Sequence, residues 1–253
     1  VHWVLPNRPL LRGSAVMAPR TPARYLAVFF DLDDTIFDFV QCSRQAFFQA
    51  CRCCHWSSSE EAFTEFQRLD QMLWSQQKAG HLTVEQVIHR RAESMARWFG
   101  HPEQSLAFQQ RFSQCLAEEA ALEPHARETL SLLHKKVPLY GASNGILAIQ
   151  QARLEKANLT TYFSSLFVSD KIGAEKPDPR FFTFCLQRSG FPAEDVLMVG
   201  DSLTADIAGA SSVGMDGCWY HPHTAPPPAN TILPHAITDL RKLLTGPFVW
   251  GSP

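Results

Sequence analysis

The chain has 253 residues, 45% of them hydrophobic, and a net charge of −2. This length and composition suffice for one large domain or for a core with an inserted smaller one. The small net charge argues against an electrostatic nucleic-acid binder, and no apolar run approaches the roughly 18–20 residues that span a bilayer. Seven cysteines, an odd number, argue against a fully paired secreted framework. We expect a cytoplasmic protein that acts on a small molecule, with neither a nucleic acid polymer nor a membrane as partner.

Both ends of the chain look like appendages. Residues 1–24 carry four arginines, no acidic residue and no clear periodicity, a composition that an organelle transit peptide can share. The low serine content and the missing amphipathic pattern favour a disordered extension instead. The same reasoning predicts a tail of this kind at residues 245–253.

Five short apolar runs separated by helical patterns predict a parallel sheet. The first run, residues 25–30, leads directly into Asp31 and is apolar throughout, as in a strand covered on both faces. The other runs lie at residues 137–142, 165–169, 196–200 and 217–220. Strands that alternate with helices in this way indicate an α/β fold with a doubly wound, Rossmann-type parallel sheet, at residues 25–36 and 124–244.

Single residues predict where two of the helices begin or end. Asp178 followed by Pro179 is typical of a helix start, because the aspartate caps free N–H groups and proline suits the first turn. A second helix is predicted at residues 204–213, where Gly214 can adopt the left-handed conformation that ends it.

Residues 37–123 interrupt the alternation of strands and helices. This stretch holds no convincing strand and is rich in Gln, Glu, Ala, Phe and Trp at helical spacing. Gly80 and residues 100–102 divide it into three or four helices, so we expect a helical cap inserted after the first strand. Residues 51–55 form a Cys-x-Cys-Cys-His cluster whose spacing matches no common structural zinc site, and we assign no metal there.

Polar side chains follow the predicted strands of the core where each strand ends. They are Asp31 and Asp33 after the first strand, Ser143 and Asn144 after the second, Lys176 in the loop after the third, and Asp201 and Asp206 after the fourth. Ligands of open α/β sheets bind beyond the carboxyl ends of the strands. We therefore expect these residues to converge on one site.

The residue types in this set fit phosphoryl transfer. Crowded carboxylates repel one another unless a cation neutralises them, and oxygen ligands select Mg²⁺. A hydroxyl, N–H groups at a helix start and a lysine ammonium are suited to bind a phosphate. Phosphate monoesters hydrolyse very slowly in water, so charge stabilisation must supply most of the reduction in barrier. The sequence predicts an Mg²⁺-dependent phosphatase that acts on a small phosphorylated substrate.

Position along the chain suggests the catalytic and metal-binding roles. Asp31, at the tip of the strand, is the expected nucleophile and would form an aspartyl-phosphate. Asp33 is the expected general acid for the leaving alkoxide and then the general base for water. The expected Mg²⁺ ligands are the side chains of Asp31 and Asp201 and the backbone carbonyl of Asp33. Asp206 is expected just outside the ligands, although it could simply favour a helix N-terminus.

Ser143, Asn144 and Lys176 are the expected phosphate-binding residues. Lys176 would hold Asp31 and the phosphate together. Each residue also has a purely structural interpretation when taken alone, since Ser143 could be a helix cap and Lys176, before a proline, could lie in an exposed turn.

The order of these motifs resembles that of the haloacid dehalogenase-like hydrolase superfamily. Asp31-x-Asp-x-Thr is followed by Ser-Asn-Gly, Lys-Pro and Gly-Asp-Ser-x3-Asp, and the resemblance covers essentially residues 24–244. It implies the sheet order 5-4-1-2-3 and a helical C1 cap at residues 37–123. Within the superfamily, residues 168–182, Leu73-Trp74 and residues 91–94 are similar to the bacterial pyrimidine 5′-nucleotidases, with the sialic-acid 9-phosphatases as near neighbours.

The resemblance leaves alternative functions open. Dehalogenases lack an acid at the position of Asp33, because a halide leaves without a proton, so its presence favours a phosphatase. A phosphatase with the same core could act instead on a sugar phosphate, as an N-acylneuraminate-9-phosphatase does, or on phosphoglycolate. A non-catalytic, phosphate-binding regulatory protein of the receiver type is the alternative from another class, but receivers are shorter and have neither a cap nor an acid like Asp33.

Substrate choice is expected to reside in the cap. Its aromatic residues include Phe63, Phe66, Trp74, Trp98 and Phe99. Most of these should pack inside the cap, and one or two could face the strand ends and stack on a flat base. This interpretation predicts a preference for pyrimidine nucleoside monophosphates over sugar phosphates.

Overall fold

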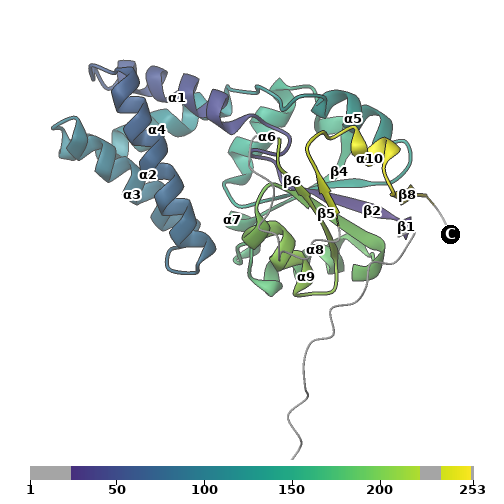
Figure 1. The fold of residues 1–253 in the computed structure, drawn as a ribbon. Helices are drawn as coiled ribbons and strands as arrows, with labels where there is room; N and C mark the ends of the chain where they lie inside the picture. Colours follow the sequence, from purple (N-terminus) through teal and green to yellow (C-terminus); the bar gives the residue numbers. More distant parts are fainter. Residues whose placement is uncertain (1–23, 223–234, 252–253) are drawn as a thin grey trace, which may run out of the picture.

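A computed structural model describes residues 24–222 and 235–251 of the chain (Figure 1). Residues 1–23, nearly all of the predicted N-terminal extension, lie outside the described residues. Within the part that the structure describes, no helix is both long and apolar enough to cross a membrane.

A six-stranded parallel sheet forms the centre of the core (Figure 1). Its strands, in spatial order, are β4 (Phe163–Val168), β3 (Leu139–Ser143), β2 (Ala27–Phe30), β5 (Val196–Gly200), β6 (Asp216–Tyr220) and β7 (His235–Ile237). The chain leaves β2 toward β3 and β4 on one side and later builds β5 to β7 on the other. The predicted doubly wound parallel sheet is confirmed, with the strands before Ser143, Asp31 and Asp201 side by side. The edge strand β7 was not predicted.

Helices cover both faces of the sheet (Figure 1). One face carries α5 (Ala126–Leu133), α6 (Leu147–Lys156) and α10 (Lys242–Thr245), and the other carries α7 (Ser169–Ile172), α8 (Pro179–Ser189) and α9 (Gly209–Ser211). Side chains of β2 alternate between the two layers, because Val28 and Phe30 pack toward α5 while Ala27 and Phe29 pack toward α8. Both faces are therefore buried, which explains why the first strand is apolar throughout. Short turns η1 (Pro102–Gln104), η2 (Thr160–Tyr162) and η3 (Ala193–Asp195) join other elements.

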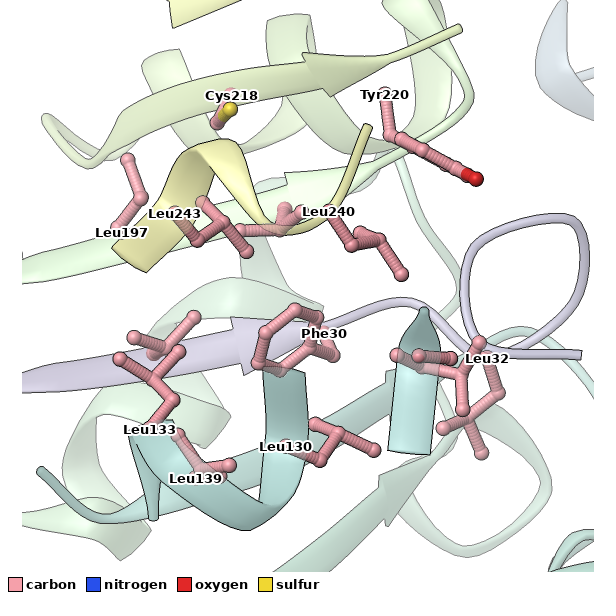
Figure 2. Close-up of a cluster of buried hydrophobic side chains, with 14 of the residues drawn as sticks. Phe30, Leu32, Leu130, Leu133, Leu139, Leu197, Cys218, Tyr220, Leu240 and Leu243 are labelled. Atoms are coloured by element: carbon pink, nitrogen blue, oxygen red, sulfur yellow. The ribbon is translucent and has the colours of Figure 1, made fainter. Parts of the chain in front are cut away.

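Figure 2 shows the larger of the two core clusters, with Phe30 between Leu130 and Leu133 of α5 on one side and Leu240 and Leu243, before and within α10, on the other. Phe30, Leu130, Leu133, Leu240 and Leu243 have no exposed surface. Burying each such side chain contributes about 1.5–3 kcal/mol. This packing holds in place the strand that leads into Asp31.

The cap consists of four helices, α1 (Phe39–Cys53), α2 (Glu60–Lys78), α3 (Val84–Trp98) and α4 (Ser105–Ala117), which lie to one side of the core (Figure 1). Three of them are preceded by a residue whose side chain accepts a hydrogen bond from a backbone N–H of the first turn. These residues are Asp38 before α1, Ser59 before α2 and Thr83 before α3. The helices enclose a hydrophobic cluster of their own. Residues 31–38 and 118–123 connect the cap to the core.

The structure corrects the predicted C-terminal tail. β1 (Arg24–Tyr25) pairs in parallel with β8 (Val249–Trp250), and the Trp250 ring lies 5.8 Å from the Tyr25 ring between centroids. The prediction of disorder is therefore wrong for these residues and for Arg24, because the aromatic side chains bury one another and order a short segment with little local preference of its own.

The two predicted helix boundaries are present, with one difference. The Asp178 side chain accepts a hydrogen bond from the Arg180 N–H at the start of α8, and Gly214 has a φ of +85°. The helix predicted at residues 204–213 instead begins as a π-helix, η4 (Leu203–Ala208), before α9. The carbonyl of Ser202 accepts hydrogen bonds from the N–H groups of both Asp206 and Ile207, so this first turn is widened.

Candidate active site

The predicted site residues line one cavity of about 620 Å³ at the carboxyl ends of the strands. The residues brought together there are Asp31, Asp33, Ser143, Asn144, Lys176, Asp201 and Asp206. The strand register explains this, because Phe30 lies opposite Gly141 of β3 and Val199 of β5, so the three strands end at nearly the same level.

Three carboxylates form the base of the cavity. Asp31, Asp201 and Asp206 each offer an oxygen atom, and these atoms lie within 4.8 Å of one another. Burial raises the pKa of Asp31 well above its usual range, against the attraction of Lys176, and the neighbouring carboxylates raise it further. Burial and the charge of Asp206 raise the pKa of Asp201 to about 7. A positive charge placed among these oxygens stabilises the ionised form of the carboxylates.

Lys176 supplies a positive charge beside this cluster from the loop between α7 and α8. Its side chain is almost fully buried, and Nζ lies 2.7 Å from Oδ1 of Asp31 and 2.6 Å from Oδ1 of Asp206. Burial alone would lower the pKa of Lys176, but the two carboxylates outweigh it and raise the pKa above its ordinary value. The lysine therefore stays charged and ties Asp31 to Asp206.

Asp206 is held rigidly against the end of β5. Its Oδ2 accepts a hydrogen bond from the Ser202 N–H at 3.0 Å, while Oδ1 accepts from Lys176. Gly200 makes room for this approach, since a Cβ atom there would overlap the Asp206 carboxylate. With both oxygens engaged, Asp206 serves mainly to orient Lys176 and the backbone that precedes it.

Ser143 is the last residue of β3 and Asn144 follows it, and neither of them caps a helix. Helix α6 begins only at Leu147, and no side chain caps it. The Ser143 hydroxyl accepts a hydrogen bond from Gln150 at 3.1 Å. The Asn144 side chain bonds both backbone groups of Lys176, accepting from its N–H and donating to its carbonyl, each at 2.8 Å. Asn144 thereby fixes the loop that carries the lysine, a role that the sequence did not predict.

Asp33 lies at the cavity wall with 28% of its side chain exposed. Its Oδ1 accepts a hydrogen bond from Nη1 of Arg153 at 2.5 Å, and its Oδ2 accepts one from Gln150 at 2.8 Å. Both partners come from α6, and sequence reasoning missed both. The usable signal was an arginine inside a helix whose neighbouring positions face the core.

The sequence model of the haloacid dehalogenase-like hydrolase family matches residues 25–214, which make up most of the chain. The chain belongs to the haloacid dehalogenase-like hydrolase family. The predicted family is thereby confirmed, and with it the prediction of a hydrolytic enzyme.

Three relatives of this hydrolase span nearly its whole described length. Pyrimidine 5′-nucleotidase PynA of Streptococcus pneumoniae is 32% identical over 79% of the chain and 85% of PynA. Pyrimidine 5′-nucleotidase YjjG of Escherichia coli is 30% identical over 85% of the chain and 95% of YjjG. The crystal structure of the HAD-hydrolase YfnB from Bacillus subtilis, bound to magnesium, superimposes with a TM-score of 0.82 at 30% identity and covers 88% of this chain and 98% of YfnB.

The carboxylate cluster of this hydrolase fits a magnesium ion. Hard oxygen ligands are those that Mg²⁺ prefers, and it is usually held by one or two carboxylates together with water and substrate phosphate. Asp31 and Asp201 have the raised pKa values expected of carboxylates that need a cation, whereas the Asp206 oxygens are already hydrogen-bonded. The side chains that would hold the ion are therefore those of Asp31 and Asp201.

The cap of the hydrolase is attached to the core beside Lys176. Gln77, in the last turn of α2, donates a hydrogen bond to Glu175 at 3.0 Å and lies 3.2 Å from the Lys176 carbonyl. The other Glu175 oxygen accepts from the Val84 N–H, at the start of α3, at 2.8 Å. These contacts separate the site from a second cavity of about 1020 Å³ between cap and core. We call these contacts of Glu175 and Lys176 with the cap the latch. Sequence patterns missed the latch because the residues that it joins are about a hundred positions apart.

Of the five aromatic residues singled out in the cap, Trp74 is the one at the active-site cavity. It lines the cavity together with Phe39, Asp70 and Lys78. The other four aromatic residues singled out in the cap lie elsewhere: Phe63 and Phe66 are buried inside the cap, Phe99 stacks on Trp56, and Trp98 is 43% exposed.

Proposed function

We propose that the chain is an Mg²⁺-dependent phosphatase that hydrolyses pyrimidine nucleoside 5′-monophosphates through an aspartyl-phosphate on Asp31. The observation that carries this proposal is the cavity itself, which Asp31, Lys176 and Asp33 of the core line together with Trp74 of the cap. The core residues supply the charges that a phosphate needs, and the cap supplies an aromatic side chain.

The first half of the reaction transfers the phosphoryl group to Asp31. An oxygen of the Asp31 carboxylate attacks phosphorus while the bond between phosphorus and the ester oxygen breaks, and Asp33 gives a proton to the leaving alkoxide. Lys176 keeps Asp31 oriented for attack and balances the negative charge on the phosphoryl oxygens. A bound Mg²⁺ supplies further neutralisation of these oxygens.

The second half of the reaction releases phosphate. Water attacks the phosphorus of the aspartyl-phosphate, Asp33 takes up the proton of that water, and the bond to Asp31 breaks to restore its carboxylate. Asp33 thus ends the cycle protonated again, ready for the next leaving group.

The size of the cavity and its aromatic wall support a nucleotide as substrate. About 620 Å³ lies within the usual range for small-ligand sites. Stacking of a base on an aromatic side chain contributes roughly 1–3 kcal/mol, and a sugar phosphate lacks a flat ring to use it. The two relatives that are pyrimidine 5′-nucleotidases support the same choice.

A panel of phosphorylated metabolites tests the proposal. We expect a higher kcat/KM on UMP or dTMP than on phosphoglycolate, hexose phosphates or N-acylneuraminate 9-phosphate. A sugar phosphate preferred by about tenfold, equivalent to about 1.4 kcal/mol, would refute the nucleotidase assignment and leave the phosphatase mechanism standing. If purified protein with Mg²⁺ hydrolyses no ester of the panel, the chain is not a phosphatase and the non-catalytic alternative gains.

A further inference from the structure

Arg153 of α6 is a fully buried cation in the core. Its side chain has no exposed surface, and its ion-pair partner is the Asp33 carboxylate. Removing an arginine from water is strongly unfavourable unless a well-placed anion compensates. Among the described residues, Asp33 is the one carboxylate paired with this guanidinium, so the orientation of Asp33 depends on Arg153.

Arg153 also contacts both segments that connect the cap to the core. The guanidinium lies over the ring of Phe37, 4.2 Å from its centroid, in the first connecting segment. Its Nε donates a hydrogen bond to the Glu119 carbonyl at 3.1 Å in the second. One planar group therefore contacts the two segments and Asp33 at once, which the rigid fork of an arginine permits and a lysine ammonium does not.

The two connecting segments are bonded to each other as well. The Asp38 N–H donates to the Ala121 carbonyl at 3.1 Å, and the Glu123 N–H donates to the Ile36 carbonyl at 2.9 Å. A movement of the cap must therefore pass through this pair of segments together. Because Arg153 rests on both, such a movement also changes the contacts that place Asp33.

Gln150, one turn earlier on α6, completes the arrangement. Its Nε2 donates to Asp33 at 2.8 Å and to the Ser143 hydroxyl at 3.1 Å, while its carbonyl oxygen accepts from Arg153 at 3.1 Å. Both oxygens of Asp33 are thus held by α6, and the same helix reaches the predicted phosphate site.

We propose that Arg153 is a positioning residue that couples the Asp33 carboxylate to the two segments connecting cap and core. Gln150 acts with it by holding the other oxygen of Asp33. The inference rests on the proposed phosphatase function. It concerns only the proton transfer by Asp33, and not the attack by Asp31, so its effect must depend on how much the leaving group needs a proton.

The test compares kcat/KM on two esters, a nucleoside monophosphate with an alkoxide leaving group and 4-nitrophenyl phosphate, whose phenolate leaves without protonation. This constant reports on steps up to formation of the aspartyl-phosphate. Asp33→Asn sets the scale, with an expected loss of roughly 10²–10⁴-fold on the nucleotide. Arg153→Lys should lose about tenfold or more on the nucleotide and stay within about twofold on the aryl ester, because it perturbs the same proton transfer less completely.

A control on the same helix is Lys156→Met. Lys156 also bridges to the second connecting segment, through Glu118 at 3.0 Å, but both side chains are more than half exposed. This variant should match the wild type on both esters. If thermal melting shows that Arg153→Lys is unfolded, Gln150→Leu decides instead, because it removes a bond to Asp33 while leaving the guanidinium intact.

The outcomes separate the inference from the function on which it rests. A selective loss on the nucleotide supports the coupling. Equal losses on both esters, or an unchanged rate on the nucleotide in a folded variant, overturn it while the wild type still acts as a phosphatase. A wild type that hydrolyses neither ester overturns the proposed function and the inference together.

Discussion

Gln77 in the cap and Glu175 in the core are joined by a hydrogen bond of 3.0 Å next to Lys176. Glu175 also accepts from the Val84 N–H, so a single carboxylate holds the end of one cap helix and the start of the next. Glu175 is followed directly by Lys176, whose side chain lies in the active site. The position of the cap and the position of the lysine are therefore set by the same loop.

Glu175→Ala should weaken catalysis without unfolding the protein. The variant loses both contacts to the cap, while Asn144 still holds the Lys176 backbone. We expect kcat/KM to fall about tenfold, because small displacements of positioning groups have effects of this size or larger. The control is Glu85→Ala, whose side chain is mostly exposed. Steady-state kinetics with thermal melting separates the two variants, and equal behaviour would contradict the latch.

Asp31→Asn should abolish turnover while the fold stays intact. The substitution keeps the volume of the side chain but removes the nucleophile, and Lys176 retains its ion pair with Asp206. We expect less than about a hundredth of the wild-type rate. Circular dichroism and thermal melting should match the wild type. Residual activity above this level in protein free of other phosphatases would exclude Asp31 as the nucleophile.

Removal of metal should stop hydrolysis reversibly. Without a metal ion, Asp31 and Asp201 lie near other carboxylates, and the charges of Lys176 and Lys78 compensate only in part. We expect EDTA to abolish activity, Mg²⁺ to restore it, and Asp201→Ala to raise the Mg²⁺ concentration that half-activates the enzyme at least about tenfold, as expected for loss of a ligand. Full activity in metal-stripped enzyme would show that the carboxylate cluster has another role.

The stabilisation by Mg²⁺ should depend on pH. Burial raises the pKa of Asp201 from 3.8 to about 7. In the pH window between these two values, the folded, metal-free protein holds a proton on Asp201 that the unfolded chain has lost. This group therefore lowers the free energy of unfolding as the pH rises through the window, and the loss is complete above about pH 7. Mg²⁺ binds the deprotonated form and reverses this loss.

The measurement for this effect is the rise in Tm on adding Mg²⁺. We expect a larger rise at about pH 8 than at about pH 6, because protons compete with the ion at the lower pH. In Asp201→Asn the rise should shrink and lose most of its pH dependence. A rise that is equal at both pH values in the wild type would show that Asp201 is not the titrating ligand.

Trp74→Leu should change substrate choice more than it changes chemistry. The leucine keeps an apolar side chain at the cavity wall but removes the aromatic face, which contributes roughly 1–3 kcal/mol to base stacking. We expect the KM for UMP to rise about tenfold or more with little change in kcat, while kinetics on a small phosphate ester without a base stay the same. The matched control is Trp98→Leu, since Trp98 is 43% exposed and is not among the residues that line the active-site cavity. An unchanged KM for UMP would remove Trp74 from substrate recognition.

Local patterns in the sequence were enough to predict the fold class, the cap and the convergence of the motifs. A strand buried on both faces leaves a continuous apolar run such as residues 25–30. A residue that starts a helix, such as Asp178, or one that ends it, such as Gly214, acts within one helical turn. Because the carboxyl ends of parallel strands meet at one edge, the positions of Asp31, Ser143 and Asp201 along the chain already implied that they lie at the same edge of the sheet.

Only the tertiary structure decided which side chains surround these motifs. Arg153 contacts Asp33 across 120 residues, and Gln77 contacts Glu175 across 98. β1 and β8 are two residues long each and pair from opposite ends of the chain. None of these contacts has a periodicity or a spacing to reveal it, because each depends on how whole elements pack. A buried arginine becomes tolerable only when packing delivers its carboxylate, and that is a property of the folded chain rather than of any segment of it.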